Sequence, residues 1–139
     1  MPFVDLTNTI AFTQNLIAGY LNSDRVNITC ANTFVGLVGL KDTDLINNKT
    51  EIGYWLSESF QHKGIITRSC KGLMDYAFKI LGMNRVQLKA ATENFKSQRV
   101  AERLGLSLEG IERDGELHDK GFVDLKIFAL LKKDFISSN

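Results

Sequence analysis

The amino-acid sequence predicts a single α+β domain, residues 1–139, built on a mixed, mostly antiparallel sheet. Alternating and β-branched runs gather toward both ends of the chain, and a strand–helix–strand unit lies between them. Such a unit requires one crossover in an otherwise antiparallel sheet, and one strand pair is expected to diverge there. The length of 139 residues leaves room for one domain.

The first part of the chain predicts one helix and then three strands. Residues 8–21 place apolar side chains at helical spacing behind good N-cap residues. The runs 26–30, 34–40 and 51–56 alternate or are β-branched, which predicts an antiparallel meander. Between the last two runs, residues 41–49 are polar and rich in turn formers, so a loop is expected there.

A second, well-patterned helix and another strand follow. Residues 66–81 carry one apolar stripe, and Gly82 stands where a glycine commonly ends a helix. Residues 85–91 then alternate cleanly between apolar and polar side chains. Together with the strand before the helix, this run completes the predicted strand–helix–strand unit.

The last part of the chain predicts a short helix and a hairpin. Asn94 is a suitable N-cap for a helix that stops at Gly105. Residues 106–114 and 122–131 predict two strands, joined through a turn at 115–121.

Composition excludes several classes of function. With 17 basic and 16 acidic side chains, the net charge of +1 gives no broad basic surface for nucleic acid. Two histidines and two cysteines are too few for most metal sites, so no metal is expected. Cys30 and Cys70 lack redox spacing, which is typical of a reducing compartment. Neither a basic leader nor an apolar run of about 18 residues occurs, so we expect a cytoplasmic protein without a membrane partner.

The junction between the strand at 51–56 and the following helix carries the chemistry. A helix that begins near Gly64 has backbone N–H groups without intrahelical partners and a partial positive charge at that end. Gly64 permits close approach of an anion, and Lys63 adds a cation. Taken alone, an isolated glycine at a helix start more often only eases a turn.

Several motifs resemble those of the GNAT acetyltransferase superfamily. Residues 61–66 (QHKGII) resemble its acetyl-CoA pyrophosphate loop, Gln/Arg-x-x-Gly-x-Gly/Ala, and residues 51–67 resemble the RimJ/RimL-type branch, which acetylates N-terminal amines of ribosomal proteins. Residues 94–97 (NFKS) and 103–106 (RLGL) resemble the family's Asn-x-x-Ser helix start and its closing turn. The resemblance covers residues 26–135 and implies the GNAT-like fold.

The chain departs from the family pattern at a few positions. Ile66 replaces the last small residue of the loop, Ala101 stands where many members carry a tyrosine general acid, and Leu106 replaces an aromatic residue. The strand and helix that usually precede the helix at 8–21 are expected to be missing. Two alternatives would account for this: either the chain is a shortened paralogue, or a partner covers the exposed sheet edge, for example in a homodimer.

The resemblance implies acetyl-CoA as co-substrate, held by three groups of residues. Backbone groups of residues 55–57 would pair with the pantetheine arm, and the backbone N–H groups of residues 62–67 would hold the pyrophosphate. Asn94 would hold the pantetheine or the chain near it. The predicted cofactor-binding residues are Trp55, Leu56, Ser57, Gln61, His62, Lys63, Gly64, Ile65, Ile66, Thr67 and Asn94.

Acetyl transfer to an amine needs a base for the amine and a proton for the leaving thiolate. Glu51 is the candidate general base, with a solvated carboxylate as the equally favoured alternative. Ser97 is the candidate proton donor, with an ordinary capping hydroxyl as its alternative. Cys70 lies on the apolar stripe of its helix, so we expect direct transfer without an acetyl-enzyme.

The predicted function is acetyl-CoA-dependent N-acetyl transfer to a primary amine, which is either a protein N-terminus of the ribosomal-protein type or a small amine. The alternative is a non-catalytic acyl-CoA-binding module of the same fold, motivated by Ala101 and by the short N-terminus. A nucleotide-phosphate binder ranks last, because no Mg²⁺-holding pattern accompanies the loop.

Overall fold

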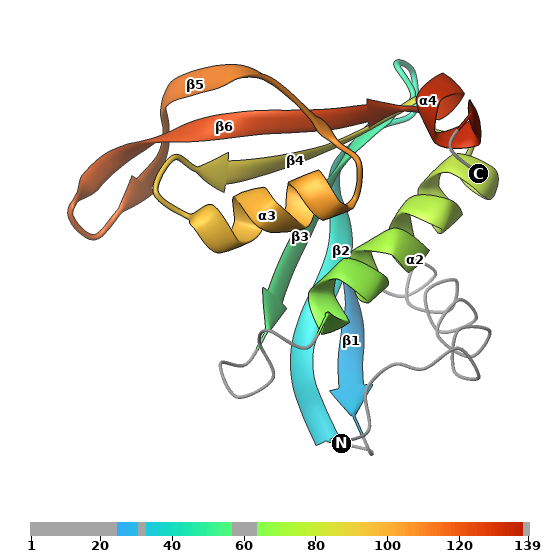
Figure 1. Cartoon of the computed structure of the whole chain (residues 1–139), viewed down its shortest axis with the longest axis horizontal. Coiled ribbons are helices and arrows are strands. Elements are labelled where there is room, and N and C mark those ends of the chain that lie inside the picture. The colour runs from blue at the N-terminus through green and yellow to red at the C-terminus, as the bar shows by residue number, and fades with distance from the viewer. Residues whose placement is uncertain (1–24, 31–32, 57–63, 138–139) are drawn as a thin grey trace.

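The computed structural model describes residues 25–30, 33–56 and 64–137 of the chain (Figure 1). The predicted helix at 8–21 lies outside these ranges. Six strands form one sheet in the order β1-β2-β3-β4-β6-β5, which is mixed and mostly antiparallel, as the sequence predicts. The strands are β1 (Arg25–Cys30), β2 (Thr33–Asp44), β3 (Lys49–Leu56), β4 (Arg85–Ala91), β5 (Ser107–His118) and β6 (Gly121–Leu131).

The only parallel neighbours in this sheet, β3 and β4, pair over a very short stretch. Three residue pairs join them, and the last is Glu51 with Gln87. Beyond that pair β3 continues beside β2, whereas β4 continues beside β6. Figure 1 shows the two strands spreading apart from a common start. The predicted divergence of one strand pair is therefore confirmed.

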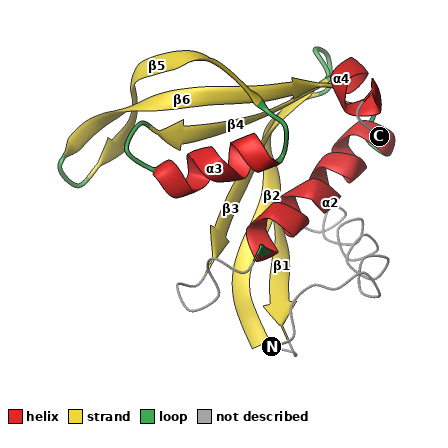
Figure 2. Ribbon diagram, in the orientation of Figure 1, coloured by secondary structure: helices red, strands yellow, loops and turns green. Residues whose placement is uncertain are grey.

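Helices α2 (Ile65–Lys79) and α3 (Phe95–Arg103) lie on the same face of the sheet (Figure 2). The apolar stripe of α2 buries Cys70, Leu73, Ala77 and further side chains against Val38, Leu40 and Ile52 of β2 and β3 and Val86 and Leu88 of β4. Strand side chains alternate between faces, so the residues between these core positions point to the other face, which we call the distal face.

The structure contains the helix-terminating glycines and the N-cap residue that the sequence predicts. Gly82 follows α2 with φ 70°, and Gly105 follows α3 with φ 81°, both in the left-handed region that glycine tolerates. Asn94 caps α3, because its side-chain oxygen accepts a hydrogen bond from the backbone N–H of Ser97. These residues fix where each helix ends, and therefore how the next strand enters the sheet.

Two segments differ from the sequence prediction. The expected loop at 41–49 is instead the end of β2, a turn over 45–48 and the start of β3, and Asp44 accepts hydrogen bonds from the backbone of that turn. The expected turn at 115–121 is likewise shorter, because β5 continues to His118. In both places exposed polar side chains lie on strands that project beyond the core.

A C-terminal helix, α4 (Lys132–Ser137), is absent from the sequence prediction, which treats Lys132 and Lys133 as a solvated end. Its Phe135 is buried and stacks on Phe78 of α2 with the ring centroids 4.7 Å apart. One aromatic residue therefore fastens this short helix to the core. Among the helices of the described ranges, none combines the length and the apolar character needed to cross a membrane.

We predict that Phe78→Ala lowers the free energy of unfolding by about 3–5 kcal/mol, because it leaves a cavity in the core and removes the stacking on Phe135. Chemical denaturation measures this loss. Phe122→Ala is the matched control: Phe122 is 64% exposed on β6, and its loss is expected to cost less than about 1 kcal/mol. Equal effects of the two substitutions would contradict this account of the core.

Candidate functional site

The N-terminus of α2 opens toward the space that β3 and β4 leave between them. Gly64 adopts φ 73° and ψ 7° immediately before the helix, and none of the described side chains caps this end. The first helical hydrogen bond runs from the N–H of Arg68 to the carbonyl of Gly64. The N–H groups of the three residues before Arg68 therefore lack intrahelical acceptors, and the helix dipole adds partial positive charge.

A cavity of about 320 Å³ lies at this helix end, and we call it the strand-gap cavity. Its lining comes from β3, from the start of α2, and from α3 with its cap. The lining residues are Tyr54, Trp55, Gly64, Ile65, Ile66, Thr67, Asn94, Lys96, Ser97, Arg99, Val100 and Arg103. Seven of them are predicted site residues, drawn from three separate segments of the sequence.

The charged residues of this lining are all cations. Lys96, Arg99 and Arg103 lie at positions i, i+3 and i+7 of α3, which places them along one face of the helix. Among the described residues, neither aspartate nor glutamate contributes to the lining. The sequence interpretation missed these three residues because the net charge of the whole chain is near zero. Their helical spacing was the available signal.

A short hydrogen bond crosses the cavity between β3 and α3. The Tyr54 hydroxyl and the Ser97 hydroxyl lie 2.6 Å apart, and either can be the donor. Burial raises the pKa of Tyr54, an effect that the bond to Ser97 opposes, so this phenol stays protonated well above neutral pH. The hydroxyl predicted as a proton donor is thus joined to a second protonated hydroxyl, while the Ser97 N–H binds Asn94 as a cap.

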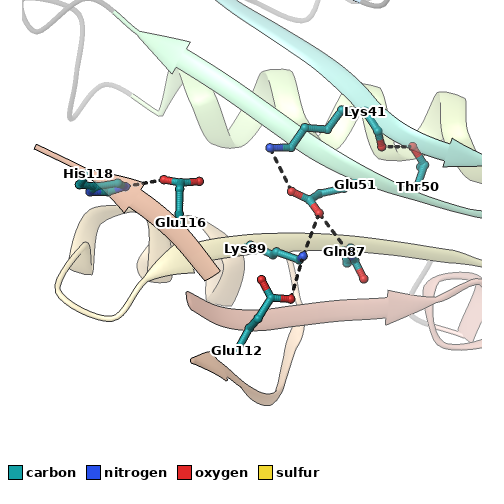
Figure 3. Close-up of polar contacts among 8 residues, drawn as sticks. All are labelled: Lys41, Thr50, Glu51, Gln87, Lys89, Glu112, Glu116 and His118. Carbon is teal, nitrogen blue, oxygen red and sulfur yellow. Dashed lines mark hydrogen bonds and ion pairs between the residues drawn. The ribbon is translucent and has the colours of Figure 1, made fainter. Parts of the chain in front are cut away.

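Glu51 lies on the distal face and is only 4% exposed. The alternative of a solvated carboxylate is therefore wrong. The Gln87 side-chain amide donates to Glu51 Oε1 at 3.0 Å, and Lys41 Nζ lies 3.1 Å from Oε2 (Figure 3). Lys89 Nζ is more distant from the carboxylate, at 4.0 Å. The lining of the strand-gap cavity does not include Glu51.

The remaining predicted residues fall into three groups. Leu56 ends β3 at the mouth of the gap. Cys70 is fully buried, and burial raises the pKa of its thiol to about 12, which places this cysteine in the core as predicted. The loop residues Ser57, Gln61, His62 and Lys63 lie outside the described ranges.

The site thus combines polar hydrogen-bond donors with a cationic wall. Backbone N–H groups of α2 and the side chains of α3 face one cavity, beside the part of β3 that no longer pairs with β4 after Glu51. This arrangement suits a ligand that carries several phosphate charges and a chain able to pair with a strand.

Comparison with known proteins supports the same interpretation. The family model of the acetyltransferase (GNAT) domain matches residues 5–107. A solved structure described as a probable acetyltransferase superposes with a TM-score of 0.78 at 37% identity, covering 86% of this chain and 69% of that chain. The fold and the resemblance predicted from the sequence are both confirmed.

Named relatives include enzymes with different acceptors. "Putative ribosomal N-acetyltransferase YdaF" of Bacillus subtilis is 40% identical over 83% of this chain, and the match spans 63% of that relative. The spermidine N(1)-acetyltransferase of Escherichia coli is 33% identical over 62% of this chain and 46% of its own length. This chain thus spans a little under two thirds of YdaF. The family match over most of the chain, together with the fold, shows that it belongs to the GNAT acetyltransferases.

Proposed function

We propose that this protein is an acetyl-CoA-dependent N-acetyltransferase that moves an acetyl group directly from the thioester to a primary amine. The observation that carries the proposal is the strand-gap cavity, in which the amino end of α2 and three cations of α3 meet the part of β3 that no longer pairs with β4. A polyanion with a peptide-like arm, such as coenzyme A, matches all three of these features.

The residues present fit coenzyme A. Gly64 carries no side chain, and a β-carbon built on it meets no described atom within 4 Å, so a diphosphate can approach the N–H groups behind it. Backbone groups of Tyr54 and Trp55 lie beside the cavity, beyond the stretch in which β3 pairs with β4, and would contact the amides of the pantetheine arm. Arg99 and Arg103 would face the remaining phosphate charge.

On the acid side, Ser97 would give its proton to the leaving thiolate. The bond of Ser97 to Tyr54 orients its hydroxyl, and the phenol can replace the donated proton. Ala101 is completely buried and absent from the cavity lining, so the position where many members of the family carry a tyrosine faces the core here. This pair of hydroxyls would fill the vacant role.

On the base side, Glu51 would accept a proton from the amine, directly or through water. It is the last residue of β3 that pairs with β4, so its carboxylate lies where the gap begins. The acid and the base then act from opposite faces of one strand. This separation allows two substrates to approach the reacting carbonyl from different sides.

The acceptor we favour is a protein N-terminal α-amine, which fits the RimJ/RimL-type motifs and the ribosomal name of YdaF. Relatives named for spermidine make a small polyamine the competing acceptor.

The proposed function is tested by titrating acetyl-CoA calorimetrically and by following CoA release with a panel of amines. The panel holds peptides with free N-termini and spermidine. Binding together with release, and the loss of release in Glu51→Gln, is the expected result. Binding without release for every amine would overturn transfer and favour a non-catalytic acyl-CoA-binding module instead.

We predict that the double variant Arg99→Gln/Arg103→Gln raises the Kd for acetyl-CoA at least tenfold, because each charge-assisted contact to phosphate contributes about 1.5–3 kcal/mol. Calorimetry checks this change. Arg113→Gln, on exposed β5 outside the cavity, is the matched control and should leave the Kd within twofold. A similar effect of all these substitutions would exclude a specific role for α3.

We predict that Ser97→Ala lowers kcat about a hundredfold and that Tyr54→Phe lowers it about tenfold, because both remove a proton donor from the leaving group. Steady-state kinetics measures these changes. The Kd for acetyl-CoA should stay within about threefold in both variants. A rise in Kd at unchanged kcat would assign the two hydroxyls to binding rather than to proton transfer.

We predict that Cys70 resists iodoacetamide at pH 9 in the folded protein and reacts readily in denaturant, since a thiol with a pKa of about 12 remains protonated at that pH. Mass spectrometry of the peptide that contains it provides the measurement. The unfolded thiol ionises first, so stability should fall as the pH rises above about 9. Rapid labelling of the folded protein would contradict this assignment of Cys70 to the core.

A further inference from the structure

A second cavity, of about 310 Å³, lies between β2 and β3, and we call it the distal cavity. Gly39 and Gly53 are direct partners across these two strands and form the floor of the cavity. Because both are glycines, neither fills the cavity with a side chain. Tyr54 and Trp55 line both this cavity and the strand-gap cavity. The two cavities therefore meet at the same two residues of β3.

The side chain of Lys41 lies across the glycine floor of the distal cavity. A β-carbon built on Gly53 would lie 3.5 Å from Lys41 Cε and 4.0 Å from its Nζ. The ammonium ends 3.1 Å from Glu51, and Figure 3 shows it reaching the carboxylate from the side opposite Lys89. An aliphatic stem ending in a primary ammonium thus already lies beside the proposed base.

The other described cations considered on this face, Lys89 and Arg85, lie closer to other carboxylates than to Glu51. Lys89 Nζ lies 3.2 Å from Glu112 but 4.0 Å from Glu51, and Arg85 pairs with Glu109 at 2.8 Å. Among the described residues, Lys41 is therefore the nearest counter-charge of the buried Glu51 carboxylate. Its own side chain is 55% exposed, compared with 6% for Glu51. The lysine can leave toward solvent, whereas the carboxylate stays in place.

We infer that Lys41 occupies the place of the acceptor's ammonium group and competes with it for Glu51. An acceptor amine on an aliphatic stem would enter the distal cavity, displace the lysine side chain, and bring its nitrogen between Glu51 and the residues shared with the strand-gap cavity. The inference rests on the proposed function. Displacement is feasible, because the Lys41 side chain is 55% exposed and can turn into solvent while the new ammonium takes over its ion pair with Glu51.

The test uses n-butylammonium, which reproduces the stem and charge of a lysine side chain, titrated by NMR without acetyl-CoA. Lys41→Ala should bind this probe at least tenfold more tightly than the original chain does. Lys41→Met keeps the stem on the glycine floor and should give a smaller gain. Glu51→Gln in the Lys41→Ala background should abolish binding, and Lys120→Ala, in the exposed β5–β6 turn, should change nothing.

Unchanged or weaker binding of n-butylammonium by Lys41→Ala would overturn the inference, as would an equal gain in Lys120→Ala. Circular dichroism of each variant verifies folding, and Lys41→Met serves if Lys41→Ala is unstable. Because the titration needs no thioester, its outcome is separate from that of the transfer assay. Tighter binding without CoA release would support the competition and contradict the proposed function.

Discussion

The arrangement of the site depends on one constraint, namely that β3 and β4 stop pairing after Glu51. From that residue onward, among the described strands, β3 pairs with β2 and β4 pairs with β6, so the facing edges of β3 and β4 border an opening inside the sheet. Buried backbone groups of this kind are costly unless something pairs with them. The amino end of α2 adds further donors at the same opening. The fold thus creates an opening in which the amides of a ligand can pair with β3 and its phosphates can bind the N–H groups of α2.

The two faces of β3 differ in charge, and this difference would separate the two halves of the proposed reaction. On the helix side, Lys96, Arg99 and Arg103 line a cavity whose described residues include no acidic side chain. On the distal face, the cations alternate with Glu51, Glu109 and Glu112 in a nearly balanced network. A polyanion is therefore favoured on one face, whereas an amine finds a carboxylate on the other. A single strand of alternating side chains supplies both environments.

Local signals in the sequence predicted most of the fold. The limits of β4, the Asn94 cap and the stops at Gly82 and Gly105 each depend on a few neighbouring residues, and the structure has all of them. The extension of β2 to Asp44 and the helix α4 were missed, because a polar projecting strand resembles a loop and a six-residue helix has almost no periodicity.

The site was only partly predictable, because its contacts join distant parts of the chain. The start of α2 after Gly64 follows from a local motif, but the bond between Tyr54 and Ser97 joins residues 43 positions apart. The contact of Lys41 with Glu51 requires the register of β2 on β3, which composition does not give. The three cations of α3 share one helix face, but only the fold shows that this face lines the strand-gap cavity.

The opening between β3 and β4 is built by strand pairing, so it exists before any ligand arrives. The cations of α3 attract a polyanionic ligand to this preformed cavity over a distance. Such long-range attraction raises the association rate more than it lowers the dissociation rate. Under the proposed function, the product coenzyme A would then exchange rapidly for acetyl-CoA. For such a protein the ionic strength of the medium would set the association rate of coenzyme A. The shape of the opening in the sheet would set which ligands bind tightly.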